Sequence, residues 1–362
     1  MRDIRISIAM IVSILISLGI VMIYSSSGIY ALQQLGDSAY FLNRHLFFLT
    51  LSVVLMLMVM MVDYRELRRL AKPLLLAGIV LLVLVLIPGI GKESNGARRW
   101  FQVGPINFQP SEFVKIAVLI YVADFLARKK NKIRDFKEGF LPLMIVLGMV
   151  CLLIIKQPDM GNSVSIAVIV LILMFVVGAR MRHLGMIVLA AIPVVYLLIV
   201  KAPYRLARIM AFLDPWEDSL GIGFQLTQSQ IALGSGGLIG VGLGKSVQKL
   251  FYLPAAHTDF ILSIIGEELG FMGTLTVIGL FILLIWQGAR IAKRTNDDFG
   301  YFLATGIVAM IGLQAVVNIG VSIGALPTKG LPLPFVSYGG SALIFNMLAI
   351  GLLLNISRHQ DL

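Results

Sequence analysis

The sequence has one cysteine, four histidines and only 14% charged residues among its 362 positions. A single cysteine, Cys151, cannot form a disulfide within the chain, and its place in an apolar run makes it a small core residue. No spacing of histidine, cysteine and carboxylate residues is typical of a zinc site, and the chain has no G-x-S-x-G elbow. The sequence therefore excludes a disulfide framework and predicts no metal site.

Hydrophobic residues make up 58% of the chain, which is the composition of a polytopic membrane protein. The net charge of +11 would suit a nucleic-acid ligand if the basic residues gathered on one surface. They are instead sorted between alternate loops, as is common when positive charge sets the orientation of membrane spans. We therefore predict a membrane protein without a nucleic-acid partner.

Ten apolar runs are long enough to cross a membrane as helices. They lie at about 6–24, 46–62, 73–90, 111–127, 139–155, 163–179, 184–200, 259–286, 301–325 and 338–357. The first run follows two arginines but is too long for a signal peptide and precedes no convincing cleavage site, so we predict an uncleaved helix. The predicted fold is an all-α polytopic membrane protein with a single domain over residues 1–362.

The orientation follows from the distribution of lysine and arginine. Eighteen of them lie at the N-terminus, the C-terminus and the short loops of one side, whereas eleven lie in the much longer loops of the other side. The side with eighteen is predicted to be cytoplasmic, so both termini are cytoplasmic and the long connections at 88–110 and 201–258 face outward. The short cytoplasmic loops leave no room for a nucleotide-binding domain.

A glycine-rich stretch from Gly234 to Gly244 precedes Lys245 and Ser246. A P-loop would need a glycine six residues before the lysine, where this chain has Ile239, so the motif fails. We predict a re-entrant or surface loop instead, because irregular backbone at membrane depth persists only where protein or water satisfies it.

The same outer connection contains two further segments. Arg205 to Leu213 has the pattern of a helix lying in the membrane interface. The segment 223–230, which includes Gln225, is polar but uncharged. It is either a surface that binds hydroxyl and amide groups or a solvated loop helix.

Residues 250–262 place an acid where a loop meets an apolar segment. Thr258 or Asp259 is suited to cap the helix that follows. Glu267 and Glu268 come eight and nine residues after Asp259, which is more than about 10 Å along a helix that rises ~1.5 Å per residue. Two carboxylates at that depth require polar partners or a function.

Other polar residues lie within predicted spans. Glu112 and Lys115 are three residues apart and suited to neutralise each other on one helix face. Gln314, Asn318 and Ser322 follow one another at steps of four, and for two of the three we predict hydrogen bonds between helices.

Acids and cations gather at the outer ends of several spans. Gln157 and Asp159 follow the fifth span, and Lys329 precedes a helix start at residues 337–340. The free backbone N–H groups of a helix start, with glycines that allow close approach, suit an anion. The pattern predicts a polar cleft that opens outward.

A bond formed in such a cleft must take its energy from an activated substrate, because the outer face has no ATP. A lipid-linked sugar diphosphate meets that requirement. A carboxylate would deprotonate the acceptor hydroxyl, and lysine or arginine would stabilise the departing diphosphate. Composition alone does not separate this activity from transport.

Several strings of this sequence resemble the SEDS family of shape, elongation, division and sporulation proteins, and together they cover nearly the whole chain. The strings are Gly96 to Trp100, Gln109 to Glu112, Gln157 to Asp159, the 214–216 and 225–229 segments, Phe251 to Gly270 and Asn318 to Gly340. Thr328-Lys329 and Gln248 to Phe251 resemble the division and sporulation members more than the elongation members.

The resemblance implies a peptidoglycan glycosyltransferase of the plasma membrane that polymerises lipid II on the outer face during cell division. It implies inverting transfer with release of undecaprenyl diphosphate, a class B penicillin-binding protein and divisome proteins as partners, and no certain cofactor, with the participation of a divalent cation left open. The family's essential aspartate falls on Asp259, which we predict to be the catalytic base. The predicted substrate-binding residues are Arg99, Trp100, Glu112, Lys115, Gln157, Asp159, Gln225, His257, Thr258, Lys329, Ser337, Tyr338, Gly339 and Gly340.

Two other functions stay open at this point. A lipid II flippase would need a cleft but no base, and the charges of Lys115, Glu267 and Glu268 would suit it, although no inverted repeat is present. A scaffold without activity would not depend on Asp259. Many division members have an acid where this chain has Ala255, so no carboxylate role is predicted at that position.

Overall fold

A computed structural model describes residues 1–362 except 95, 105, 251–252, 255 and 361–362. Ala255, at which no carboxylate role is predicted, is thus outside the described residues. The longer helices are α1 (Arg2–Leu35), α2 (Tyr40–Met61), α3 (Leu67–Leu84), α4 (Pro110–Lys129), α5 (Leu141–Lys156), α6 (Met160–Val176), α7 (Met181–Val200), α8 (Pro203–Leu213), α9 (Phe224–Ser235), α10 (Ile261–Arg294), α11 (Asp298–Ser322) and α12 (Gly340–His359). Short helical turns, η1 (Tyr64–Glu66), η2 (Lys130–Lys132) and η3 (Phe136–Phe140), join some of them.

A helix overlaps each of the ten predicted apolar ranges. By length and composition seven helical segments could cross a membrane: Arg2–Leu35, Tyr40–Met61, Phe136–Lys156, Met181–Val200, Ile261–Arg294, Asp298–Ser322 and Gly340–His359. The apolar α6 is shorter than these seven segments, and α3 and α4 have more than two charged residues in every 18-residue stretch, so these three helices are not among the candidate spans. The first helix extends to Leu35, well beyond the predicted end near residue 24, and stops where Gly36 adopts a left-handed φ of 74°.

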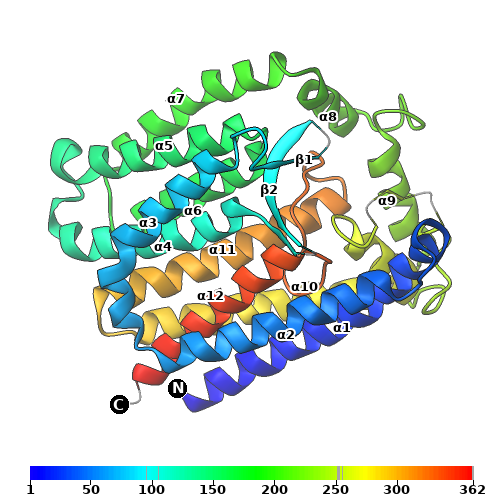
Figure 1. Cartoon of the computed structure of the whole chain (residues 1–362), viewed down its shortest axis with the longest axis horizontal. Coiled ribbons are helices and arrows are strands. Elements are labelled where there is room, and N and C mark those ends of the chain that lie inside the picture. The colour runs from blue at the N-terminus through cyan, green and yellow to red at the C-terminus, as the bar shows by residue number, and fades with distance from the viewer. Residues whose placement is uncertain (95, 105, 251–252, 255, 361–362) are drawn as a thin grey trace.

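The helices form a bundle in which α4, α11 and α12 supply much of the core (Figure 1). Most residues of α12 are buried, whereas on α7 only His183 and Leu184 are buried. The two termini lie at one end of the bundle, and the connection before α4 and the α8–α9 region lie at the other end (Figure 1).

The connection 88–110 contains a small antiparallel sheet that the all-α prediction missed. Its strands are β1 (Lys92–Ser94), β2 (Ala97–Val103) and β3 (Ile106–Phe108), in the order β1-β2-β3. Two of these strands have only three residues, which is too short for an alternating pattern to stand out in a sequence. Gly96 and Gly104 take positive φ in the two turns.

The glycine-rich loop packs against a break in α10 and hydrogen-bonds to the helix on both sides of it. Gly270 there has φ 70° and ψ −167°, so the helix divides into a shorter part before Gly270 and a longer part after it. The loop bonds to both parts through backbone groups: Val241 N and Gly242 N donate to Glu267 O (2.9 Å) and Glu268 O (3.0 Å), and Phe271 N and Met272 N donate to Gly237 O (2.9 Å) and Leu238 O (3.1 Å). A Cβ on Gly270 would lie 2.3 Å from Gly240 N, so only glycine permits this contact.

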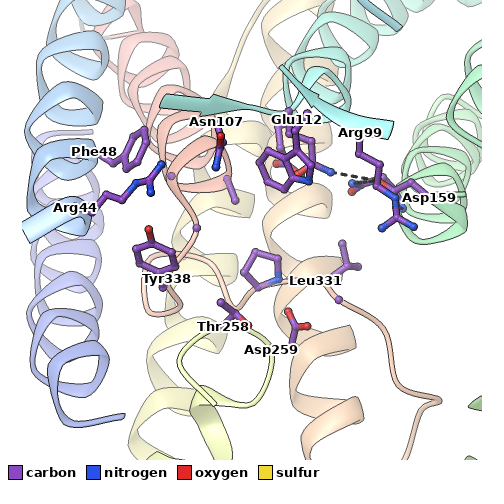
Figure 2. A pocket seen from close by; sticks show the side chains of 18 residues that line it. Arg44, Phe48, Arg99, Asn107, Glu112, Asp159, Thr258, Asp259, Leu331 and Tyr338 are labelled. Carbon is purple, nitrogen blue, oxygen red and sulfur yellow. Dashed lines mark hydrogen bonds between the residues drawn. The ribbon is translucent and has the colours of Figure 1, made fainter. Parts of the chain in front are cut away.

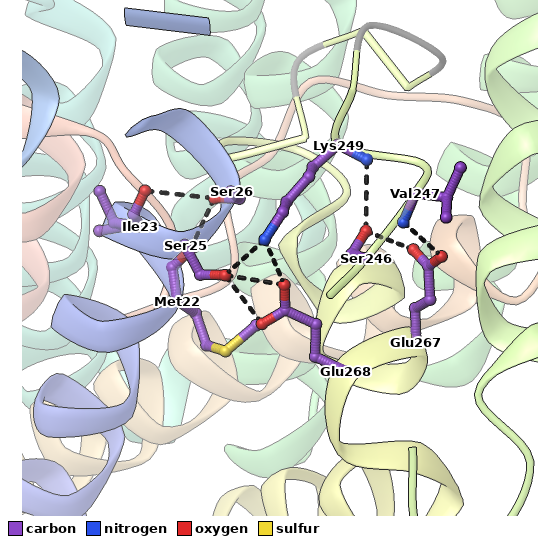
Figure 3. A network of polar contacts seen from close by, with 9 residues as sticks. All are labelled: Met22, Ile23, Ser25, Ser26, Ser246, Val247, Lys249, Glu267 and Glu268. Atoms are coloured by element: carbon purple, nitrogen blue, oxygen red, sulfur yellow. Dashed lines mark hydrogen bonds and ion pairs between the residues drawn. The ribbon is translucent and has the colours of Figure 1, made fainter. Parts of the chain in front are cut away.

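Figure 3 shows where the two glutamates of α10 lie. The Glu268 carboxylate binds the Lys249 ammonium at 2.8 Å and accepts a hydrogen bond from the Ser25 hydroxyl at 2.7 Å. Glu267 accepts hydrogen bonds from Val247 N at 2.9 Å and from the Ser246 hydroxyl. Both glutamates are buried, and each has close polar partners. We call the six residues of this network the anchor cluster: Ser25, Ser246, Val247, Lys249, Glu267 and Glu268.

Candidate active site

A cavity of ≈ 380 Å³ lies at the end of the bundle that carries the sheet. Its walls come from α2, the sheet, the N-terminal turns of α4, α6 and α12, and the loops that precede α10 and α12. The lining residues are Arg44, Phe48, Arg99, Trp100, Asn107, Gln109, Glu112, Asp159, Asn162, Thr258, Asp259, Gly330, Leu331, Pro332, Tyr338, Gly339, Gly340 and Ala342 (Figure 2).

Asp259 lies in the turn before α10, and its carboxylate faces the cavity (Figure 2). The predicted capping role for Thr258 or Asp259 is wrong, because the N-cap position is Phe260 and no side chain bonds there. A Cβ on Gly330 would lie 3.3 Å from Asp259 Oδ2, so the opposite loop passes close to the carboxylate. Burial raises the pKa of Asp259 to about 6, against the opposing effect of Arg208.

Arg99, on β2, holds the turn between α5 and α6. Its guanidinium donates to Gln157 O at 2.9 Å and to Pro158 O at 2.5 Å. The Gln157 side chain instead donates to Leu82 O on α3 at 3.1 Å, so it does not line the cavity. This arrangement fixes the short segment that carries Asp159.

Asp159 caps α6 and also reaches the cavity. Its carboxylate accepts hydrogen bonds from Asn162 N (3.2 Å), Asn162 Nδ2 (2.9 Å) and Gln109 Nε2 (3.2 Å). An N-terminal carboxylate is stabilised there by the helix dipole and the free N–H groups.

The predicted pairing of Glu112 with Lys115 is present, with 2.8 Å between the carboxylate and the ammonium and both side chains buried. Lys329 lies close by, and its side chain occupies the space beside Gly161. Burial lowers the pKa of Lys329 to about 8, with Asp159 raising it and Lys115 lowering it further.

His257 supports the wall behind Tyr338. Its ring lies 4.6 Å from the Phe41 ring and 5.7 Å from the Tyr338 ring, between centroids. Burial lowers the pKa of His257 to about 4, so it is neutral at physiological pH. The Ser337 hydroxyl accepts a hydrogen bond from Leu333 N at 2.9 Å and stabilises the loop rather than lining the cavity.

The structure thus brings most of the predicted residues together around the cavity. Lys115, Gln157, His257, Lys329 and Ser337 lie outside its lining, and so does Gln225, which is exposed on α9. Sequence reasoning missed Arg44, Phe48, Asn107 and Asn162. The sequence did offer a signal for Arg44, because it is a lone arginine next to the second predicted span, 46–62.

The carboxylates of the cavity do not fit a metal site made by protein alone. Glu112 is paired with Lys115, and Asp159 is bonded to amide groups. Within the described part of the chain no group of three or more histidine, cysteine, aspartate or glutamate side chains could hold a metal ion.

Residues 5–362 match the model of the cell cycle protein family that includes FtsW, RodA and SpoVE. This chain belongs to that family. It is 49% identical over 348 residues to the "Probable peptidoglycan glycosyltransferase FtsW" of Trichlorobacter lovleyi, covering 96% of this chain and 91% of that protein. The resemblance inferred from the sequence strings is therefore confirmed.

Two solved structures share the fold. One belongs to work described as "Structural coordination of polymerization and crosslinking by a peptidoglycan synthase complex", with TM-score 0.79, 32% identity, and coverage of 98% of this chain and 97% of that chain. The other is Rod shape determining protein RodA of Thermus thermophilus, with TM-score 0.73, 29% identity and the same coverage. The chain is thus a mostly helical, multi-pass membrane protein of this family.

Proposed function

We propose that this chain is a peptidoglycan glycosyltransferase that polymerises lipid II during cell division. The observation that carries the proposal is the position of the Asp259 carboxylate, half-buried in a polar cavity with cations nearby, in a chain 49% identical to a probable peptidoglycan glycosyltransferase FtsW. An aspartate with a pKa near 6 is a better base near neutral pH than one with an ordinary pKa.

In the proposed reaction Asp259 accepts the proton of the acceptor's GlcNAc 4-hydroxyl. The hydroxyl oxygen attacks the anomeric carbon of the donor's MurNAc with inversion, and the bond between that carbon and the diphosphate oxygen breaks. Undecaprenyl diphosphate leaves with the bonding electron pair. Arg99, Lys115 and Lys329 are the proposed sources of positive charge for the diphosphate.

We further propose ten spans with both termini in the cytoplasm, a single domain over residues 1–362, and a cavity that opens outside the plasma membrane. The clustering of both termini at the end opposite the cavity supports this orientation (Figure 1). A class B penicillin-binding protein is the proposed partner, supported by the likeness to a structure from a peptidoglycan synthase complex. Other divisome proteins are expected to join them.

The test is glycan polymerisation from purified lipid II in detergent, with the cognate penicillin-binding protein co-purified. Wild type is expected to form long strands, and a folded Asp259→Ala variant none. Detergent removes the two sides of the membrane, so a flippase would give no product. An absence of polymer from wild type, despite an intact complex, would favour the flippase. Equal polymer from both proteins would remove Asp259 as the base.

A further inference from the structure

Asn318, on α11, lies directly behind the loop that carries Asp259. Its side-chain amide donates one hydrogen bond to Asp259 O at 2.9 Å and another to Leu331 O at 2.8 Å. Both of these residues line the cavity, and Figure 2 shows them close to each other on two adjacent loops. One amide group thus joins the backbone of both loops.

The position of this amide is set by its surroundings. Asn318 is 1% exposed, and because both partners are carbonyl oxygens, the NH₂ group must face them. Its Oδ1 has no hydrogen-bond partner among the described residues. A buried oxygen without a partner is unfavourable, so the two donated bonds are what this asparagine supplies.

The prediction that two of Gln314, Asn318 and Ser322 bond between helices is therefore wrong, because the Asn318 and Ser322 side chains both bond elsewhere. Ser322, in the same stripe, donates to Asn318 O within its own helix at 3.0 Å. Asn318 bonds to two loops, neither of which belongs to a neighbouring helix.

A second hydrogen bond joins the two loops, at Tyr338, seven residues after Leu331. Tyr338 N donates to His257 O at 2.9 Å. Asp259 is therefore held on one side by the bond at His257 and on its own carbonyl by Asn318. With two such bonds, the segment carrying the carboxylate has little freedom to rotate relative to Gly330 and Leu331.

We propose that Asn318 is a positioning residue for the reaction: its amide fixes the Asp259 backbone against the Leu331 loop and so holds the carboxylate at the acceptor hydroxyl. The inference rests on the proposed function, in which Asp259 is the base. Misplacement of a reacting group by about 1 Å reduces a rate by about 10²-fold.

The first test compares Asn318→Leu, which keeps the approximate shape but donates no hydrogen bond, with Gln314→Leu as a matched control. Gln314 lies one turn earlier on α11 and is also buried. In lipid II polymerisation with the partner present, Asn318→Leu is expected to lower kcat by about 10²-fold with KM for lipid II within roughly threefold of wild type. A purely structural role predicts equal losses in the two variants, which would overturn the proposal.

The second test reports on the carboxylate without turnover. A hydrophobic carbodiimide reacts with protonated carboxyl groups, and mass spectrometry of the modified peptide gives the pH midpoint of labelling at Asp259. Wild type should show a midpoint near pH 6, the pKa raised by burial. In Asn318→Leu the released loop admits water, so the midpoint is expected to fall toward the ordinary aspartate value of about 3.9. An unchanged midpoint together with unchanged kcat would overturn the proposal.

These readouts separate the two proposals. If Asp259→Ala still polymerises lipid II, the proposed base is wrong, yet the labelling midpoint still decides whether Asn318 positions the carboxylate. If Asn318→Leu does not give a folded protein, Asn318→Ser, which retains one donor, replaces it. An intermediate kcat and midpoint are then expected, and wild-type values in both would contradict the proposal.

Discussion

The cavity, with Lys329 near it, and the anchor cluster both bring acids close to a lysine, but the pairing of these charges differs. In the anchor cluster Lys249 and Glu268 are 2.8 Å apart and are 4% and 0% exposed. At the cavity, Glu112 is paired with Lys115, but within the described part of the chain neither Asp259 nor the nearby Lys329 forms an ion pair, and burial moves the pKa of each toward neutrality. Paired buried charges fix a structure, whereas buried charges without a direct counter-ion are prepared for proton transfer or for an anionic ligand.

The anchor cluster and the cavity are linked through the chain segment that carries Asp259. Its Lys249 and Ser246 lie in the same connection that leads to Asp259, and Glu268 lies on the shorter part of α10 that follows it. The paired charges thus hold both ends of the segment that carries the unpaired acid.

The largest effect is expected from replacing the unpaired acid. Asp259→Asn removes the base while keeping the shape, so polymerisation should fall by about 10²- to 10⁴-fold. The melting temperature should stay the same or rise, because the raised pKa means that ionised Asp259 is unfavourable in its site at neutral pH. Lipid II polymerisation and thermal unfolding in detergent measure the two. A large fall in melting temperature would mean that Asp259 has a structural role instead.

The opposite result is expected for the paired lysine. Lys249→Met leaves the buried Glu268 carboxylate without its cation, which should destabilise the fold by about 3–5 kcal/mol. Thermal unfolding of the detergent-solubilised protein measures the change. The double variant Lys249→Met/Glu268→Gln is the control and should recover much of the stability, because no charge is then left unpaired. Equal losses in the single and double variants would show that shape, not charge, matters at this site.

The pH dependence of polymerisation should report on the two unpaired groups, Asp259 and Lys329. Polymerisation should fall about tenfold per pH unit as the pH drops below about 6, where Asp259 becomes protonated, and should fall again above about 8, where Lys329 loses its charge. Lys329→Arg should extend activity on the alkaline side, since arginine stays charged. A flat profile from pH 5 to 9 would contradict both assignments.

The sequence predicted the helices and most of the cavity, but not how the pieces meet. Apolar length identified the helices, and acids at the ends of the predicted spans pointed to Asp159 and Asp259, which line the cavity. The break in α10 at Gly270 could not be predicted, because Leu269 and Phe271 continue the apolar pattern and the stabilising partners lie in a loop some thirty residues earlier.

Contacts between segments that are distant in the chain could not be predicted from the sequence either. Arg44 is a single charge at the end of a predicted span, and only the folded bundle brings it to the same cavity as Tyr338 and Asn107. Asn318 fits a helix-packing pattern by spacing alone. Its bonds to two loop carbonyls depend on the path of loops whose sequence has no periodicity.

The smallest effect, and the most specific to the cavity, is expected from Gly330→Ala. The added Cβ would lie 3.3 Å from Asp259 Oδ2, so either the loop or the carboxylate must move by a few tenths of an ångström. Since a shift of 1 Å costs about 10²-fold, we expect kcat to fall by roughly a few-fold without loss of stability. Gly148→Ala on α5, where a Cβ would meet nothing within 4 Å, is the matched control and should leave polymerisation unchanged. If Gly330→Ala behaves like this control, the loop yields freely and the distance between Gly330 and the carboxylate does not limit the reaction.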